Sequence, residues 1–187
     1  MSLTIILAGI PGSGKSTVLE ETIKIFPSLT VINYGDMMLK EALSQNIDKD
    51  SLRKLPLFQQ QKIGIQAAKK MAANMPKIAC IDTHAMIKTP HGYCPGMPDA
   101  VVKILNPNVI GMIECPPSLI YERRKNDQTR KRDNESLEQI EYHQQISRSF
   151  LLACTAVSKA LYVPIQNHAM PSEGARQLVY VIEDLLP

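Results

Sequence analysis

Residues 9–16 combine glycines, a lysine and a serine in a pattern suited to binding phosphate. They read Gly-Ile-Pro-Gly-Ser-Gly-Lys-Ser and fit the phosphate-binding loop pattern G-x-x-x-x-G-K-[S/T]. Glycines let backbone N–H groups approach phosphate oxygens without a clashing Cβ atom. We expect Lys15 to reach the β- and γ-phosphates of a nucleoside triphosphate, Ser16 to ligate Mg²⁺, and Thr17 to add a hydroxyl near the α-phosphate. The residues predicted to hold the triphosphate are Gly9, Ile10, Pro11, Gly12, Ser13, Gly14, Lys15, Ser16 and Thr17.

The segments on either side of this loop are those that such a loop needs. The apolar run at residues 5–8 predicts a buried parallel strand. Apolar residues then recur at helical spacing and predict a helix over about residues 15–26. A glycine-rich turn that matches the pattern by chance would lack this context. Strand, loop and helix in this order therefore favour binding of a nucleoside triphosphate.

Carboxylates follow two further predicted strands. Residues 29–33 form the second expected strand and lead to Asp36, and residues 77–82 form a short apolar run that ends in Asp82. Because ligands bind at the carboxyl ends of parallel strands, we expect both side chains beside the phosphate-binding loop. An acidic residue that ends an apolar strand is typical of a Walker B strand, so we expect Asp82 to hold Mg²⁺ directly or through water. Such residues also occur without a function, but the loop upstream favours the metal role.

The densest basic stretch lies at residues 123–133 and includes Arg123, Arg130 and Arg132. A guanidinium is always charged and contacts phosphate oxygens in a bidentate way. We expect residues 124–134 to form a short lid that excludes water and stabilises charge during phosphoryl transfer. A solvated basic turn and an RNA-binding surface are alternatives that this stretch leaves open.

Two helices are predicted in succession between the second and third strands. They cover residues 37–43 and residues 51 to about 74, the second with a kink near Pro56. We interpret residues 36–74 as a helical insertion that binds the phosphate acceptor. Arg53 is its only arginine and is a candidate to bind the acceptor's phosphate, with an ordinary exposed helix arginine as the alternative. Residues 83–98, rich in glycine and proline, are expected to form a long functional loop.

The rest of the chain continues the alternation of helices and strands. Helices are expected at residues 99–105, 118 to about 125, 136 to about 160 and from 172 onward, and strands at 108–114 and 162–166. Ser136 and Gln139 form a candidate capping box. Five strands joined by helices predict an α/β chain, the three-layer α/β/α P-loop NTPase fold around a parallel sheet. At 187 residues we expect a single domain over residues 1–187.

Composition argues against several other classes of protein. The net charge of +3 is too small to imply nucleic acid binding by itself. No apolar run approaches the ~20 residues of a membrane span. The four cysteines are scattered without a C-x-x-C pair, which argues against a zinc site and against a disulfide framework. We expect no membrane or nucleic acid partner, and a reducing cytoplasm as the location.

Six segments carry distinctive motifs: Gly-Ile-Pro-Gly-Ser-Gly-Lys-Ser-Thr at 9–17, Ile-Asn-Tyr-Gly-Asp-Met-Met at 32–38, Leu-Arg-Lys-Leu at 52–55, Ile-Asp-Thr-His-Ala at 81–85, Thr-Pro-His-Gly-Tyr-Cys-Pro-Gly-Met-Pro at 89–98 and Thr-Arg-Lys-Arg-Asp at 129–133. In this order and spacing they resemble the archaeal-type adenylate kinases over nearly the whole chain. The resemblance implies reversible phosphoryl transfer from ATP to AMP, giving two ADP, with Mg²⁺. It also implies a cytoplasmic protein, often a homotrimer, with a short lid that lacks zinc.

The resemblance assigns roles to single residues as well. Its AMP-binding positions are Asp36, Arg53, Asp82, Thr83, His84 and Lys88. It places Arg123 against the base of ATP, and Arg130 and Arg132 on the phosphates, where they join Lys15 as catalytic residues.

Two positions depart from the family pattern, and the histidines are interpreted individually. Lys88 stands where family members carry arginine, so it keeps the charge without the bidentate fork, and Asn126 replaces a basic lid residue. We interpret His84 as positioning AMP, because the acceptor phosphate is already ionised and needs no general base. His143 and His168 lack a motif and are interpreted as ordinary polar residues.

Two other functions remain open at this stage. A kinase for another nucleoside monophosphate, such as UMP or CMP, would keep the mechanism, because the base is chosen by pocket contacts that sequence does not place. A nucleotide-dependent RNA-binding or assembly factor would use the basic stretch as a surface for the phosphate backbone.

Overall fold

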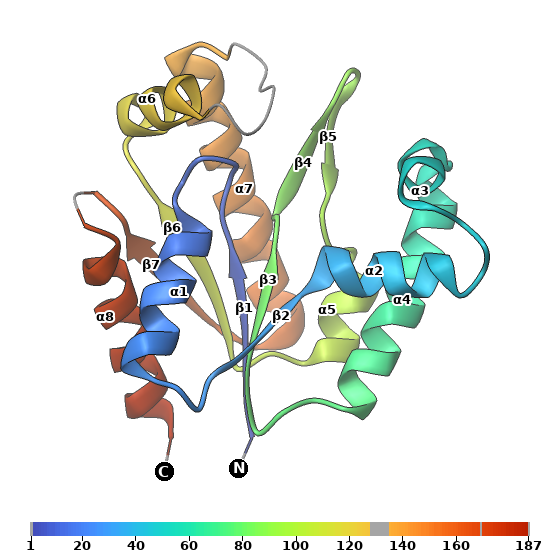
Figure 1. Cartoon of the computed structure of the whole chain (residues 1–187), viewed down its shortest axis with the longest axis horizontal. Coiled ribbons are helices and arrows are strands. Elements are labelled where there is room, and N and C mark those ends of the chain that lie inside the picture. The colour runs from blue at the N-terminus through green and yellow to red at the C-terminus, as the bar shows by residue number, and fades with distance from the viewer. Residues whose placement is uncertain (1, 128–134, 169, 187) are drawn as a thin grey trace.

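A computed structural model describes residues 2–127, 135–168 and 170–186. Figure 1 shows helices on both sides of a central sheet. Along the chain the elements are β1 (Leu3–Ala8), α1 (Lys15–Ile25), β2 (Thr30–Asn33), α2 (Tyr34–Leu43), α3 (Lys49–Lys54), α4 (Leu57–Ala73), β3 (Ile78–Thr83), β4 (Met86–Thr89), β5 (Gly92–Pro95), α5 (Asp99–Leu105), β6 (Val109–Glu114), α6 (Pro117–Asn126), α7 (Leu137–Ser158), β7 (Leu161–Gln166) and α8 (Pro171–Leu185).

The central sheet has five parallel strands in the order β2-β3-β1-β6-β7, which confirms the predicted fold. β1 is the middle strand and is buried along its whole length, as its continuous apolar sequence indicates. From β1 the chain builds the sheet first toward β2 and later toward β7. The direction of winding changes beside β1, and ligands of open α/β sheets bind at such a point. The sequence that follows β1 is the phosphate-binding loop (residues 9–16).

Each face of the sheet has its own apolar core. Helices α1 and α8 cover one face, where Val18 and Leu19 pack with Leu178 and Ile182. Helices α2, α4, α5 and α7 supply the core on the other face. The buried residues of that second core are Ile6, Ala8, Tyr34, Ala68, Met71, Ile81, Ala85, Met97, Val101, Val102, Leu105, Ile110, Met112, Leu151 and Cys154. The two cores fix the strand ends that carry the candidate site.

The predicted long loop over residues 83–98 is wrong, because most of it forms the antiparallel hairpin of β4 and β5. Thr89 closes the turn by donating from its hydroxyl to the Gly92 carbonyl oxygen at 2.9 Å, and Gly92 adopts a φ of +135°. The glycine and proline signals therefore mark the turn and ends of a hairpin. Figure 1 shows this hairpin extending beyond the edge of the central sheet.

The predicted helix over residues 51–74 is two helices, α3 and α4, and not one kinked helix. Leu55 is extended, with a ψ of 149°, because a following proline disfavours helical geometry.

Helix α2 starts at Tyr34, earlier than expected. Its N-cap is Asn33, whose side-chain oxygen accepts a hydrogen bond from the Asp36 N–H at 3.0 Å. Asp36 thus lies in the first turn of a helix.

Other local predictions agree with the structure. The capping box of α7 is present, with the Gln139 N–H donating to Ser136 Oγ at 3.3 Å and the Ser136 N–H donating to Gln139 Oε1 at 3.1 Å. The four cysteines are free thiols, and Cys80, Cys115 and Cys154 are buried. No helix in the described part of the chain has the length and apolar character needed to cross a membrane.

Candidate nucleotide-binding site

The phosphate-binding loop connects β1 directly to α1, as the sequence predicts. Gly12 and Gly14 have φ values of 89° and 87°, which other residues rarely adopt. Gly14 caps α1, so the free N–H groups of the first helical turn face the loop. A Cβ atom on Gly14 would lie only 2.3 Å from Asn167 Nδ2. Both the conformation and the space therefore require glycine at this position.

Two side chains hold the carbonyl group of Ser13. Asn167, which is fully buried, donates from Nδ2 to the Ser13 oxygen at 2.7 Å, and Arg123 donates from Nη1 to the same oxygen at 3.2 Å. In a trans peptide the next N–H points opposite to the carbonyl, so these bonds direct the Gly14 N–H away from Asn167. No motif in the sequence pointed to Asn167. The feature that could have indicated it is its position: Asn167 is a polar residue directly after β7, at the same sheet edge as the phosphate-binding loop.

Lys15 and Asp82 form an ion pair at the mouth of the loop. Asn33 donates from Nδ2 to Asp82 Oδ2 at 2.8 Å, which ties this pair to the start of α2. Burial lowers the pKa of Lys15 to about 8. The arrangement keeps a cation where a phosphate would arrive.

A cavity of about 370 Å³ opens between α2, α3, the end of β3 and the hairpin. We call it the acceptor cavity. It is lined by Lys15, Asn33, Tyr34, Gly35, Asp36, Met38, Leu39, Lys49, Leu52, Arg53, Asp82, Thr83, His84, Ile87 and Gly96. The structure thus brings together Asp36, Arg53 and the 82–84 turn, as predicted, and adds Lys49. Cations and carboxylates share this cavity, which suits a phosphorylated ligand with a polar base or sugar.

His84 connects the acceptor cavity to the phosphate-binding loop. Its Nδ1 lies 3.1 Å from the Gly9 carbonyl oxygen, a distance that fits a hydrogen bond from a protonated Nδ1. This contact fixes the imidazole at the junction of β1 and β3. A fixed ring supports the interpretation of His84 as a residue that positions a ligand.

Lys88 does not line the acceptor cavity. Its ammonium pairs with Glu135, whereas the preceding residue, Ile87, lines the cavity. Arg123 lies beside the loop, where its Nη1 contacts both the Ser13 oxygen and Cys115 Sγ, the latter at 3.3 Å. The predicted lid residues Arg130 and Arg132 lie outside the described residues.

The oxygen ligands that Mg²⁺ prefers are available at this edge of the sheet. Ser16 is exposed in the first turn of α1, and Asp82 lies next to the last residue of β3, beside Lys15. Within residues 2–127, 135–168 and 170–186, no group of three or more His, Cys, Asp or Glu side chains could hold a metal ion. Mg²⁺ usually takes one or two protein oxygens and fills its shell with water and substrate phosphates. Ser16 and Asp82 therefore fit Mg²⁺ that arrives with a nucleotide.

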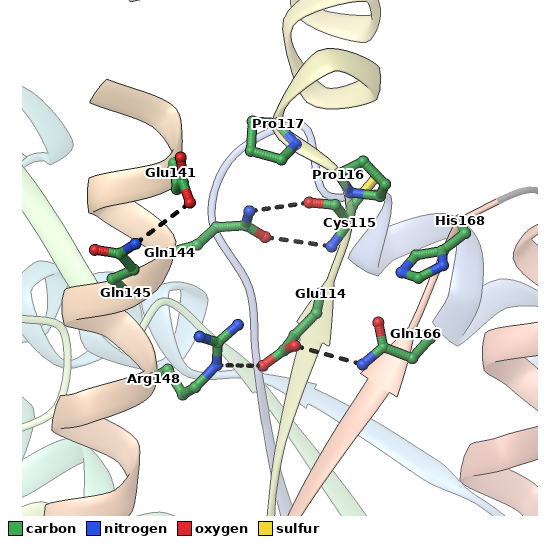
Figure 2. Close-up of a pocket in the computed structure, with 10 residues that line it drawn as sticks. All are labelled: Glu114, Cys115, Pro116, Pro117, Glu141, Gln144, Gln145, Arg148, Gln166 and His168. Carbon is green, nitrogen blue, oxygen red and sulfur yellow. Dashed lines mark hydrogen bonds and ion pairs between the residues drawn. The ribbon is translucent and has the colours of Figure 1, made fainter. Parts of the chain in front are cut away.

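A second cavity, of about 230 Å³, lies between α7 and the ends of β6 and β7 (Figure 2). Glu114 accepts hydrogen bonds there from Arg148 at 2.7 Å and Gln166 at 3.4 Å. Although burial opposes ionisation, Arg148 holds the pKa of Glu114 below its usual value. Gln144 clamps the backbone of Cys115, accepting from its N–H at 3.2 Å and donating to its carbonyl at 2.9 Å. These groups bind one another and fix the chain that leads into α6.

The two histidines without a motif have different surroundings. His168 lines the second cavity, as Figure 2 shows. His143 is buried, and its Nε2 lies 3.0 Å from the Met86 carbonyl oxygen. Its ring centroid is 4.9 Å from that of Tyr93. His143 therefore anchors the hairpin of β4 and β5 to α7, a role that needed tertiary structure to recognise.

Comparisons with known proteins agree with this geometry. A family model described as an AAA domain matches residues 8–141. The chain is 43% identical to the adenylate kinase of Pyrococcus horikoshii over 191 residues, covering 98% of this chain and 96% of that protein. It is 42% identical to the adenylate kinase of Pyrococcus furiosus, again covering 98% of this chain and 96% of that protein. A shikimate kinase structure from Acinetobacter baumannii has a TM-score of 0.56 at 14% identity, covers 100% of this chain and 97% of that one, and shares the fold.

Proposed function

This chain belongs to the adenylate kinases of the archaeal type, and we propose that it transfers a phosphoryl group reversibly from Mg²⁺-bound ATP to AMP. It is a nucleoside monophosphate kinase and hence a phosphotransferase. One observation supports the reaction most strongly. Lys15 belongs to the phosphate-binding loop and also lines the acceptor cavity. The phosphates of a donor and of an acceptor would therefore meet at one cation.

On the donor side, residues 9–17 hold the triphosphate of ATP. Backbone N–H groups of the loop and of the first turn of α1 contact its oxygens. Arg123 lies beside the loop and contacts the base. Ser16 and Asp82 hold Mg²⁺, which neutralises charge on the phosphates when it is bound.

On the acceptor side, the helical insertion over residues 36–74 and the 82–84 turn hold AMP. Arg53 binds the phosphate, while Asp36, Thr83 and His84 orient the nucleotide. Helices α2 and α3 supply the insertion's part of this surface, which agrees with an acceptor-binding unit separate from the donor loop.

In the transfer step, an oxygen of the AMP phosphate attacks the γ-phosphorus of ATP. The bond from that phosphorus to the β–γ bridging oxygen breaks, and two ADP molecules result. No general base is required, because the attacking phosphate oxygen is already ionised. Lys15, with Arg130 and Arg132 of the lid over residues 124–134, stabilises the charge that spreads over the transferring group. Excluding water from this site prevents hydrolysis of ATP.

A panel of acceptors tests the proposal. ADP formation from Mg²⁺-ATP is measured with AMP, UMP, CMP or GMP, and without acceptor. We expect fast turnover with AMP and little with the others. Preference for UMP or CMP would overturn AMP as the acceptor while keeping the mechanism. A rate of ADP formation that is the same with and without each acceptor, together with strong salt-dependent RNA binding, would instead favour an RNA-binding or assembly factor. The homotrimer implied by resemblance is tested separately by light scattering.

A further inference from the structure

A buried carboxylate bridges two cations next to the phosphate-binding loop. Glu135 is only 8% exposed, and its two oxygens pair with the Lys88 ammonium and with the Arg124 guanidinium. Burial opposes ionisation of this carboxyl, but Lys88 and Arg124 hold the pKa of Glu135 below its usual value. Glu135 is therefore a carboxylate at neutral pH. We call these three residues the Glu135 bridge.

The two cations come from opposite sides of the candidate site. Lys88 belongs to β4 of the hairpin, next to Ile87, which lines the acceptor cavity. Because neighbouring residues of a strand point to opposite faces, Lys88 lies on the face away from that cavity, toward α7. Arg124 belongs to α6, the helix that leads to the predicted lid. The Glu135 bridge thus joins the acceptor side to the donor side.

Arg124 also contacts the phosphate-binding loop itself. Its Nε donates to the Pro11 carbonyl oxygen at 2.8 Å, and a Cβ atom on Gly12 would lie 3.0 Å from its Cγ. The guanidinium is therefore held at two points, by Pro11 and by Glu135. A guanidinium with two fixed contacts loses little further freedom when a phosphate binds.

Among the described residues, the Glu135 bridge pairs two cations with one carboxylate and so carries a net positive charge. Without that carboxylate Lys88 and Arg124 would repel each other. Other described groups beside the bridge are Tyr93, which pairs with Lys88 across the hairpin and whose pKa burial raises, and His143, whose pKa burial lowers. A net positive group beside the loop is suited to anionic phosphates.

We propose that Glu135 is a positioning residue, which holds Arg124 against the phosphate-binding loop and Lys88 next to Arg124, so that both cations act on the donor's phosphates during transfer. This inference rests on the proposed phosphoryl transfer. Glu135 itself touches no nucleotide, and its effect passes through the two cations. Small displacements of such groups slow transfer strongly, because the transition state depends on their placement.

The central variant is Glu135→Gln, which keeps the shape of the side chain and removes its charge. We expect kcat to fall about tenfold or more, with smaller changes in the KM values for ATP and AMP. Glu135→Asp keeps the charge and is expected to retain more kcat than Glu135→Gln. The matched control is Asp99→Asn, which also removes a paired carboxylate. Asp99 pairs with Lys103 on α5, which is not part of the proposed site, so this variant should keep the wild-type kcat.

A double-mutant cycle with Lys88→Met separates positioning from a merely structural role. If Glu135 acts through Lys88, Glu135→Gln should cost less kcat in the Lys88→Met protein than in the wild type. Additive effects of the two changes, or a wild-type kcat in Glu135→Gln, would overturn the inference. If Glu135→Gln does not fold, an equal kcat for Glu135→Asp and wild type would overturn it. Failure of the wild type to use AMP would instead overturn the proposed function.

Discussion

The ammonium of Lys15 pairs with the carboxylate of Asp82 across the mouth of the phosphate-binding loop. Lys15 comes from the donor loop, and Asp82 lies near the carboxyl end of the neighbouring strand β3, where it pairs with Leu7 of β1. Both residues line the acceptor cavity. An arriving phosphate would therefore exchange a protein carboxylate for a phosphate oxygen at Lys15, and Asp82 would become available to Mg²⁺.

Lys15→Met should remove the cation that both nucleotides share. We expect kcat to fall by about a hundredfold to a thousandfold, as for other groups that stabilise transition-state charge. The thermal midpoint should fall somewhat, since removal of Lys15 leaves the Asp82 carboxylate without its cation, although Asn33 still donates to it. Lys24→Met on the exposed face of α1 is the control and should behave as wild type. Turnover by Lys15→Met close to the wild-type rate would remove Lys15 from the mechanism.

Arg53→Ala tests the acceptor side. Loss of a charged contact to phosphate should raise the KM for AMP about tenfold or more, with a much smaller effect on the KM for ATP. Steady-state kinetics with each nucleotide varied in turn measures both values. Lys54→Ala is the control, because Lys54 neighbours Arg53 on α3 and does not line the cavity. Equal changes in the two KM values would contradict the assignment of Arg53 to AMP.

Asn167→Ala tests how the phosphate-binding loop is held in shape. The variant leaves the Ser13 carbonyl with Arg123 alone and should lower the free energy of unfolding by about 1–3 kcal/mol. It should also lower kcat/KM for ATP more than that for AMP, because the Gly14 N–H is no longer oriented. Asn74→Ala is the control, since Asn74 makes a comparable bond, to Lys70 O at 3.0 Å, on the surface. A variant with wild-type kinetics for ATP would show that the loop keeps its shape without Asn167.

The pKa of Lys15 predicts a dependence of activity on pH. Burial lowers this pKa to about 8, so the free protein loses the ammonium as pH rises through that value. We expect kcat/KM for ATP to fall above about pH 8, because this ratio reports on the free protein. A bound phosphate favours the ammonium, so kcat should stay constant to a higher pH. Rate measurements across this range at saturating AMP give both profiles, and a flat kcat/KM well above pH 8 would contradict the account.

Much of the fold could be predicted because its signals are local. The apolar run of β1 and the glycines at positions 12 and 14 each report on a few neighbouring residues. The same kind of pattern predicted that β3 ends near Asp82, and the strand ends one residue later, at Thr83. The hairpin was mistaken for a loop because its strands are short and its turn carries the glycine and proline signals of a loop.

The contacts that organise the site could not be predicted in the same way. Asn167 and Ser13 are 154 residues apart, and no spacing pattern joins them. Lys88 was expected at the AMP phosphate, but its partner in the structure is Glu135, 47 residues further along the chain. The identity of a residue says what it can bind, whereas the packing of α6, α7 and the hairpin decides what it does bind.

The most direct test of transfer follows the γ-phosphate itself. The protein is incubated with ATP labelled at the γ-phosphate and with an excess of AMP, and the products are separated. The account predicts that the label appears as the β-phosphate of ADP formed from AMP, with little inorganic phosphate. Release of the label as inorganic phosphate at a rate that AMP does not change would contradict phosphoryl transfer and indicate a hydrolase.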